Sequence, residues 1–329
     1  MNIALLLVLV LVLAAEFANG ITDAPNAIAT VVSTRVLSPM RAVAMASVLN
    51  IVGALVTGTA VAATVGKGFV KPEAIGLEAV AAAAISVIIW TTITARIGLP
   101  TSKTHEIVAS LTGAGLAVGG TSVLLSSGWT KVLAGLGISI IVGFVGGYLI
   151  MISIYNLFRN STNSAVRKLF SRLQLLSALF VAFSHGSNDG QKFMGIFTLA
   201  LFLGGVVGSL QVPVWVILIC GGTMGLGTMF GGWRIIRTMG FRLTHLEPVN
   251  GFAAETASGM AILASSYLGI PISTTQTVNS AIMGVGATRR LSAVRWGVTR
   301  QIVTAWLLTF PVCGLLGYIL AKLFNLLGL

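Results

Sequence analysis

Two stretches of similar sequence, 171 residues apart, decide how the chain is organised. The first reads GLPTSKTH at residues 98–105, and the second reads GIPISTTQ at residues 269–276. The match continues as Gly-Ala-Gly at 113–115 and as Gly-Val-Gly at 284–286. In both stretches a proline follows a glycine and interrupts one helix, and a hydroxyl-rich run opens the next helix. We therefore expect one helix break of the same kind in each half of the chain.

A second pair of stretches repeats in the same order at nearly the same offset. FANGITDA occupies residues 17–24 and FSHGSNDG occupies residues 183–190, an offset of 166. Two ordered matches indicate duplication of a unit of about half the chain. We therefore expect a first repeat at residues 1–158, a basic linker at 159–172 and a second repeat at 173–329.

The composition excludes an ordinary soluble domain. Of the 329 residues, 56% are hydrophobic and only 9% are charged, whereas a soluble domain has about 25% charged residues. Disorder and a disulfide scaffold are excluded too, and Cys220 and Cys313 lie in apolar runs as expected of core residues. The net charge of +12 would suggest nucleic acid for a soluble protein. In a membrane protein it reports topology, so no nucleic-acid partner is expected.

Apolar stretches predict an all-α polytopic membrane protein with about ten crossings. A helix needs about 20 apolar residues to cross the hydrocarbon. The start of the chain, residues 1–15, has no basic segment before its apolar run, so we expect it to be retained rather than cleaved. The candidate spans are 3–34, 42–66, 75–97, 101–125, 132–158, 173–201, 212–232, 249–268, 273–288 and 301–326.

The basic residues predict that the two repeats are inverted. Thirteen Lys and Arg residues fall in linkers that five crossings per half place on one side, and four fall on the other side. Basic loops are cytoplasmic, so both termini are expected outside the cytoplasm. The thirteen are Arg35, Arg41, Arg159, Arg167, Lys168, Arg172, Arg234, Arg237, Arg242, Arg289, Arg290, Arg295 and Arg300. An odd number of crossings per repeat gives opposite orientations, which is a frequent architecture of secondary transporters.

Five of the eight acidic residues fall inside predicted spans, which marks a candidate site. Asp23 and Asp189 hold the same position in the two repeats, and intramembrane acids are usually functional. Asn26 lies three residues after Asp23, and Asn188 precedes Asp189. Carboxylate and amide oxygens suit a hard cation such as Na⁺, and a carboxylate also takes a proton. For Glu16, Glu106 and Glu255 we leave ion pairing and transport as equal alternatives.

The hydroxyl-rich runs predict an anion site. Thr101, Ser102, Thr104, Ser273, Thr274 and Thr275 are expected at helix N-termini, where free N–H groups and the helix dipole favour an anion. The ordinary alternative is N-capping. The residues that border these clusters are His105, His185, Gln191, Lys192 and Gln276. A single His or Gln inside the membrane often forms only a helix–helix hydrogen bond, and this is the alternative to a role in transport. Together the two kinds of motif predict symport of a cation with an oxyanion.

The motifs resemble those of the inorganic phosphate transporter (PiT) family over nearly the whole chain. NGITDAPNA at 19–27 resembles the first family signature, and SHGSNDGQK at 184–192 resembles the bacterial form of the second. PISTT at 271–275 and GFAAE at 251–255 match further family patterns. Many members have a histidine where Thr22 and Gln276 stand here, and a small residue where Pro25 stands.

The resemblance implies cation-coupled phosphate uptake, an inverted-repeat fold with broken or re-entrant helices, and a homodimer in the lipid bilayer of a prokaryotic inner membrane. It makes Asp23, Asn26, Asn188 and Asp189 ligands of Na⁺ and, for the aspartates and Asn26, of phosphate. The Ser102 and Ser273 segments become phosphate donors, with Ser102 and Ser273 also near Na⁺. His105, His185, Lys192, Glu255 and Gln276 become coupling or supporting residues.

Several alternatives stay open at this stage. The two missing histidines favour Na⁺ over H⁺ as the coupling ion, and a sulfate permease is the nearest alternative substrate class. A passive anion channel would have basic pore rings, whereas the basic residues here lie in linkers. No nucleophile–base spacing, zinc motif or cofactor motif indicates an enzyme.

Overall fold

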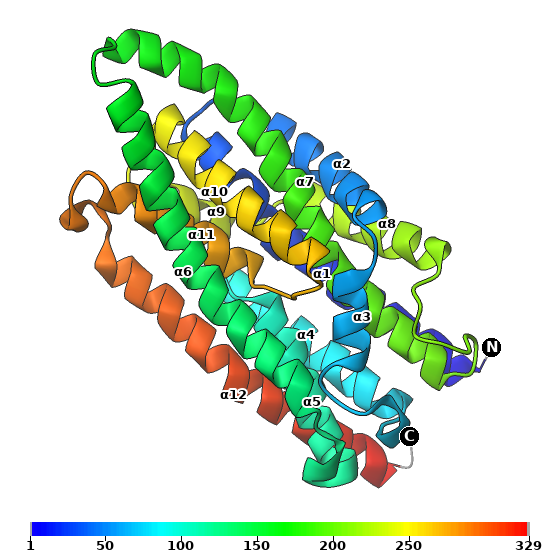
Figure 1. Ribbon diagram of the computed structural model, residues 1–329. Coiled ribbons are helices and arrows are strands. Elements are labelled where there is room, and N and C mark those ends of the chain that lie inside the picture. The colour runs from blue at the N-terminus through cyan, green and yellow to red at the C-terminus, as the bar shows by residue number, and fades with distance from the viewer. Residues whose placement is uncertain (1, 328–329) are drawn as a thin grey trace.

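The computed structural model describes residues 2–327, and these fold into helices without a strand (Figure 1). The short helical turns between the α-helices are η1 (Pro72–Ala74), η2 (Gly120–Val123), η3 (Thr238–Arg242) and η4 (Leu291–Ala293). The α-helices are α1 (Ile3–Ser33), α2 (Pro39–Val56), α3 (Ala60–Lys67), α4 (Leu77–Ile97), α5 (Lys103–Gly119), α6 (Ser126–Leu157), α7 (Asn163–Leu203), α8 (Val214–Phe230), α9 (Trp233–Arg237), α10 (Pro248–Tyr267), α11 (Thr274–Ala287) and α12 (Trp296–Leu327).

The helices fit a membrane-spanning protein. Six of the described helices are long and apolar enough to cross a membrane: α1, α2, α4, α6, α12, and α5 with the turn that follows it. Counting α8 with α9 and η3, which are bent by 64°, gives up to seven. Large apolar side chains such as Leu133, Ile141 and Leu149 of α6 are exposed, as on a lipid-facing surface. The ten crossings stay a prediction.

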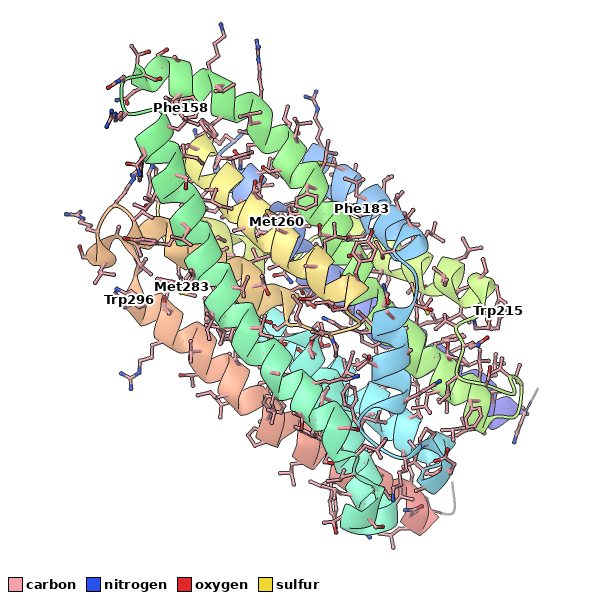
Figure 2. All side chains as sticks on the ribbon, in the orientation of Figure 1. Phe158, Phe183, Trp215, Met260, Met283 and Trp296 are labelled. Carbon is pink, nitrogen blue, oxygen red and sulfur yellow. The ribbon has the colours of Figure 1, made fainter. Side chains whose placement is uncertain are left out.

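The molecule has two distinct ends (Figure 1). The beginning of α1 and the end of α12 lie at the same end, and the turn between α6 and α7 lies at the opposite end. Figure 2 shows several nitrogen-tipped side chains projecting around that turn, near the labelled Phe158. This arrangement agrees with an odd number of chain passes before the turn.

The central linker differs from its prediction. We expected a separate segment at 159–172, but α7 already begins at Asn163 and runs for 41 residues. Thr162 caps this helix, since its side chain accepts a hydrogen bond from the Ala165 N–H at 3.3 Å. No glycine or proline lies between residues 163 and 172 to end the helix. At 1.5 Å per residue α7 is about 60 Å long, about twice the hydrocarbon thickness, so it extends well beyond it.

The predicted span at 42–66 is also wrong as a single helix. It consists of α2 and the short α3, separated at residues 57–59. Gly58 there has φ of +81°, a left-handed conformation that ends a helix. The Thr57 hydroxyl donates to the Gly53 carbonyl at 2.7 Å and satisfies a group that the helix end leaves free.

The helices are not broken at the two aspartate motifs, which corrects the prediction of broken or re-entrant helices at every motif. α1 continues through Asp23 and Pro25, and α7 continues through Asp189. Pro25 lacks an N–H and removes one hydrogen bond of α1. Tight packing holds the helix there: a Cβ on Gly20 would lie 2.4 Å from the Met224 carbonyl oxygen of α8. Both aspartates therefore lie in the middle of long helices.

The helices do break at the two Pro-containing stretches, as predicted. α4 ends before Gly98 (φ +78°) and α5 begins at Lys103, while α10 ends before Gly269 (φ +65°) and α11 begins at Thr274. With 17 and 14 residues, α5 and α11 are about 25 and 21 Å long, shorter than the hydrocarbon core of about 30 Å. Their N-termini therefore lie inside the protein, and residues along both helices are buried.

Small residues let each short helix approach a long one closely. A Cβ on Gly113 of α5 would lie 1.9 Å from the Gly314 carbonyl oxygen of α12. A Cβ on Gly284 of α11 would lie 2.0 Å from the Phe144 carbonyl oxygen of α6. Glycine at such contacts is a known means of packing helices in membranes. Gly113 and Gly284 align in the repeat, so the two halves pack their short helices in equivalent ways.

Candidate functional site

The polar centre of the protein is formed by the middles of α1 and α7. One ligand atom each of Asp23, His185 and Asp189 lies within 4.8 Å of the others, and all three residues are buried. The structure therefore brings together two helices that the sequence pattern had linked only by repetition. A buried group of two carboxylates and an imidazole can hold a cation or protons.

Asp189 is surrounded by donors. Its Oδ1 accepts from Lys192 Nζ at 2.5 Å and from Thr274 Oγ1 at 3.2 Å. Its Oδ2 accepts from Asn19 Nδ2 at 2.8 Å. Lys192 is 1% exposed, so the ion pair is fully buried. Asp189 thus joins α7 both to α1 and to the N-terminus of α11.

Asp23 is different from its repeat counterpart. Its Oδ2 has no hydrogen-bond partner within residues 2–327, although Asp23 is 2% exposed. A buried carboxylate without donors is costly unless a cation or proton accompanies it. Of the two aspartates, Asp23 is therefore the one whose charge is not balanced by a direct protein partner.

Further unpartnered oxygens lie on the same two helices. Glu16 Oε1, Asn19 Oδ1 and Asn188 Oδ1 are buried and find no donor in the described part of the chain. The Asn19 amide group donates to Glu16 at 2.9 Å and to Asp189, so it bridges the two carboxylates. Buried polar atoms are rarely left unsatisfied, and spare carboxylate and carbonyl oxygens are suitable cation ligands.

The N-termini of the two short helices face each other. Thr104 Oγ1 donates to the Ile272 carbonyl at 2.8 Å, and Thr275 Oγ1 donates to the Thr101 carbonyl at 3.0 Å. Positions 104 and 275 are equivalent in the repeat, as are 101 and 272, so the two bonds are reciprocal. The two positive ends of the helix dipoles thereby meet at one place, which favours an anion.

The predicted hydroxyls at these N-termini have mixed roles. Ser102 and Ser273 act as N-caps: each side chain accepts from a backbone N–H, that of His105 at 3.3 Å and that of Gln276 at 3.1 Å. Asn26 Nδ2 donates to Thr275 Oγ1 at 3.0 Å, which joins α1 to the N-terminus of α11. The residues predicted from the two kinds of motif are thus brought into one region.

The first stretch contains a second buried ion pair. Lys103 Nζ lies 2.8 Å from Glu106 Oε1, and neither side chain is exposed. Thr101 and Thr91 also donate to Glu106, at 2.7 and 2.6 Å. Thr101 was predicted as a phosphate donor, and in this conformation its hydroxyl is directed to Glu106. The equal alternatives left open for Glu106 thus resolve into ion pairing in this structure.

Glu255 lies in a separate hydrogen-bonded cluster. Its carboxylate accepts from Thr30 Oγ1 at 2.6 Å, from Gln174 Nε2 at 3.0 Å and from the Ser177 hydroxyl. Thr34 Oγ1 in turn donates to Gln174 Oε1 at 2.9 Å. This cluster is one to two helical turns along the chain from Asn26, at the C-terminal end of α1, which is followed by Arg35.

The remaining supporting residues lie around the centre. His105 Nδ1 is 3.2 Å from the Trp306 carbonyl oxygen, and its ring is 4.4 Å from that of Phe310 between centroids. His185 Nδ1 is 3.1 Å from Asn50 Oδ1. Asn188 Nδ2 donates to Ser266 Oγ at 3.2 Å. Gln276 is buried, and its Oε1 has no partner in residues 2–327.

Sequence reasoning missed part of this site. Asn19 was quoted within a motif but was not a predicted ligand, although it bridges Glu16 and Asp189. The signal was present, because Glu16, Asn19 and Asp23 follow each other at helical spacing on one face of α1. Gln174 of the second half meets Glu255 only through folding, and no spacing indicates that contact.

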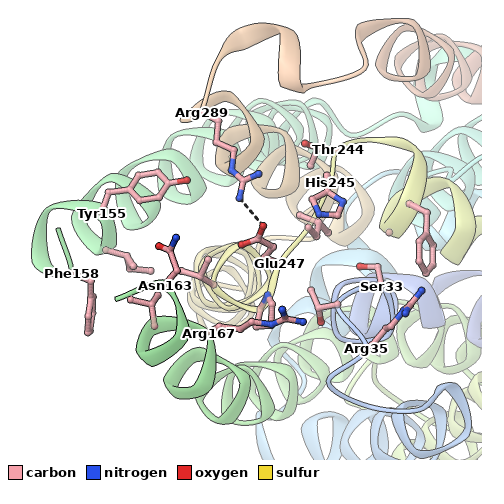
Figure 3. A pocket seen from close by; sticks show the side chains of 18 of the residues that line it. Ser33, Arg35, Tyr155, Phe158, Asn163, Arg167, Thr244, His245, Glu247 and Arg289 are labelled. Atoms are coloured by element: carbon pink, nitrogen blue, oxygen red, sulfur yellow. Dashed lines mark ion pairs between the residues drawn. The ribbon is translucent and has the colours of Figure 1, made fainter. Parts of the chain in front are cut away.

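A basic cavity of about 900 Å³ lies apart from this centre (Figure 3). Arg35, Arg159, Arg167, Arg289 and Arg295 are among its lining residues. Glu247 pairs with Arg289 at 3.2 Å, shown as a dashed line. Three of the four basic clusters of the sequence therefore surround one cavity, so these clusters lie on the same side of the molecule. Ser33 and Thr34 at the end of α1 also line it.

Long apolar helices around a buried centre of carboxylates, amides and hydroxyls define a membrane protein that handles ions. Comparison with known proteins specifies the class further. Residues 19–165 and 158–317 match the Phosphate transporter family. The chain belongs to this family, and it is a phosphate transporter rather than an enzyme, because its relatives are named as transporters.

Two relatives illustrate the match. A probable low-affinity inorganic phosphate transporter of Rhizobium meliloti (strain 1021) is 43% identical over 302 residues, which covers 92% of this chain and 90% of the relative. A protein of the same description from Bacillus subtilis (strain 168) is 37% identical over 333 residues and covers 99% and 100%. The resemblance inferred from the motifs is therefore confirmed over nearly the whole chain.

A solved structure has the same fold. It is described as the sodium-dependent phosphate transporter and superposes with a TM-score of 0.89 at 25% sequence identity. The match covers 99% of this chain and 100% of that one. The arrangement of long and short helices described above is thus that of a phosphate transporter.

Proposed function

We propose that this protein imports inorganic phosphate by symport with Na⁺ through alternating access. The observation that carries the proposal is the meeting of Asp23, His185 and Asp189 beside the N-termini of α5 and α11. Cation ligands and anion donors from both halves lie in one buried region. Na⁺ as coupling ion is further supported by the sodium dependence of the protein whose structure this fold resembles.

The Na⁺ ligands in this proposal centre on Asp23. Asp23 Oδ2 and Asn188 Oδ1 are unpartnered buried oxygens on α1 and α7. Asn26, Ser102 and Ser273 belong to the same predicted ligand set, whereas the carboxylate of Asp189, which was also predicted as a ligand, is already paired with Lys192. A Na⁺ ion here would balance the carboxylate charge that the protein itself leaves uncompensated.

The phosphate donors are the hydroxyls and N–H groups where α5 and α11 begin. Thr101, Ser102 and Thr104 belong to α5 and its approach, and Ser273, Thr274 and Thr275 to α11 and its approach. Two helix dipoles directed at one place and neutral hydroxyl donors suit a divalent or monovalent oxyanion. The aspartates and Asn26 add contacts that a protonated phosphate, but not sulfate, can satisfy as a donor.

The predicted inverted repeat supports alternating access. The reciprocal hydrogen bonds of Thr104 and Thr275 are what two equivalent halves would form across a shared axis. Inverted repeats meeting at a central site typically open it to one side and then the other. The proposal includes ten crossings, a prokaryotic inner membrane with both termini outside the cytoplasm, and a homodimer in the bilayer.

The test is uptake of radiolabelled phosphate into proteoliposomes with and without an inward Na⁺ gradient. The phosphate concentration inside the liposomes should rise above the external concentration only with the Na⁺ gradient. A choline gradient serves as the control. Equal uptake in both would contradict Na⁺ coupling. Uphill uptake driven by a pH gradient alone would instead establish H⁺ coupling, and saturation with accumulation would exclude a passive channel.

Competition by unlabelled anions distinguishes phosphate from sulfate as the transported substrate. Unlabelled phosphate should suppress uptake of the label, and sulfate at the same concentration should not. Stronger suppression by sulfate than by phosphate at the same concentration would instead indicate a sulfate permease of the same family.

A further inference from the structure

We propose that the ammonium group of Lys192 takes the cation position beside Asp189, so that the Asp189 carboxylate binds no transported Na⁺. The inference rests on the proposed Na⁺ coupling and refines its stoichiometry. Two aspartates at equivalent repeat positions would suggest two equivalent cation sites. The side chains around them show instead one open site and one site closed by a lysine of the protein itself.

The repeat comparison places the lysine where the first half has a neutral ligand. The offset of 166 that aligns Asp23 with Asp189 also aligns Asn26 with Lys192. Each residue lies one helical turn after its aspartate, on the same helix face. The second half thus has a positive charge where the first half has an amide.

Both oxygens of Asp189 accept hydrogen bonds in this arrangement. Lys192 Nζ lies 2.5 Å from Oδ1, Thr274 also donates to Oδ1, and Asn19 donates to Oδ2. A lysine ammonium is a compact point charge with three donors, so it can substitute for a small metal cation at a carboxylate. Both partners of the ion pair are buried, at 1% and 0% side-chain exposure.

The oxygens around Asp23 are arranged in the opposite way. The amide group of Asn26 donates to Thr275 Oγ1 at 3.0 Å and not to Asp23. Asp23 Oδ2 and the carbonyl oxygen of Asn19, one turn earlier on α1, have no donor within the described residues. The Asp23 carboxylate therefore keeps a free acceptor and has no ammonium partner, whereas the Asp189 carboxylate has a built-in cation.

The other buried lysine does not duplicate this role. Lys103 lies between Glu106 and Thr91 at 2.8 and 2.9 Å and forms its ion pair within its own helix. It leaves Asp23 free of a direct ammonium contact. The asymmetry between the two aspartates is thus specific to Lys192.

The experiment counts Na⁺ ions bound to the purified full-length protein. Equilibrium dialysis with ²²Na⁺ in the presence of phosphate gives the number bound per chain for the wild type and for Lys192→Asn, which restores the amide of the first repeat. We expect Lys192→Asn to bind one Na⁺ more than the wild type. Lys192→Arg and the exposed-lysine control Lys131→Asn should both bind the wild-type number. An unchanged or lower number for Lys192→Asn would overturn the proposal.

A charge-balanced variant decides the question if Lys192→Asn does not fold. Asp189→Asn/Lys192→Asn removes both charges together, which avoids a buried unpaired ion. It should bind the same number of Na⁺ as the wild type, because no Na⁺ occupies Asp189 to begin with. A loss of one Na⁺ in this variant would show that Asp189 is a Na⁺ ligand in the wild type and would overturn the proposal.

The failure of Na⁺ coupling itself would look different. A wild type that binds no ²²Na⁺ and transports phosphate independently of Na⁺ would contradict the proposed function. In that case the appearance of one bound Na⁺ in Lys192→Asn would still support the role of Lys192, and its absence would overturn that role.

Discussion

At the scale of residues, four buried carboxylates share the two aspartate helices and the start of α5, but only two of them have a lysine. Asp189 pairs with Lys192 and Glu106 pairs with Lys103. Glu16 and Asp23 form no ion pair with a lysine among residues 2–327, and each has one oxygen without a hydrogen-bond donor. The uncompensated negative charge therefore lies on α1. A bound cation or proton would stabilise the protein most there, because it would neutralise that charge.

Asp23→Asn is expected to reduce phosphate uptake to the background of protein-free liposomes. The substitution keeps the size of the side chain but removes the charge that holds the cation. Radiolabelled uptake under a Na⁺ gradient measures the effect, and Glu73→Gln on the exposed η1 turn is the matched control that should keep normal uptake. Normal uptake by Asp23→Asn in correctly inserted protein would remove Asp23 from the mechanism.

Lys103→Met is expected to destabilise the protein by about 3–5 kcal/mol, because it leaves Glu106 as a buried charge without its partner. Lys103→Met/Glu106→Gln should recover most of that loss, since both charges are gone and the glutamine oxygen still accepts from one of the two threonines. Thermal unfolding in detergent compares the two variants. Equal destabilisation by both would show that the ion pair is not what matters at this position.

The sequence was sufficient to pair the aspartates but not to describe their surroundings. Repetition indicated that Asp23 and Asp189 were equivalent, and the structure places them near each other. The difference between them depends on which neighbours donate, and that is decided by rotamers and by helix contacts. The contact of Asn19 with Asp189 spans 170 residues and leaves no pattern in the sequence.

At the scale of elements, α6 offers a direct test of the close packing between long and short helices. A Cβ on Gly143 would lie 2.5 Å from the Thr277 carbonyl oxygen of α11, whereas a Cβ on Gly137 of the same helix meets nothing within 4 Å. Gly143→Ala should therefore lower the thermal stability and the yield of folded protein. Gly137→Ala should be neutral or slightly stabilising, because alanine favours the helix by about 1 kcal/mol. Similar behaviour of both variants would contradict the packing.

The helix breaks show what sequence can and cannot predict about elements. Glycine followed by proline predicted the breaks before α5 and α11, because a left-handed glycine and a missing N–H both act locally. Pro25 and the polar motif around it suggested a further break in α1, yet α1 is continuous. Its close contact with α8 through Gly20 stabilises the helix, and such tertiary support is not visible in the local sequence.

At the scale of the whole molecule, the basic clusters predict the orientation in the membrane. Arginines from three separate linkers line one cavity, so one end of the protein is strongly basic. Positive loops remain in the cytoplasm, so residue 164 is expected inside and residue 127 outside. The sequence predicted this grouping correctly from charge alone, because the side of a loop depends on its charge and on the number of crossings before it.

Cysteine labelling tests that orientation. Ser127→Cys should react with a membrane-impermeant maleimide on intact cells, and Ser164→Cys should react only after the membrane is opened. Both positions are exposed, and the native Cys220 and Cys313 are buried and should give little background. The opposite labelling pattern would contradict the predicted orientation of both termini.

The reciprocal bonds between the starts of α5 and α11 have a consequence for the energetics of the transport cycle. Each half contributes one threonine donor and one carbonyl acceptor, so exchanging the roles of the halves leaves the number and kind of bonds unchanged. In a carrier of the proposed kind, the inward-open and outward-open forms are related by that exchange. The free energies of the two forms without bound substrate are then nearly equal. The direction of net transport is set by the ion gradient and not by a preference of the protein for one form.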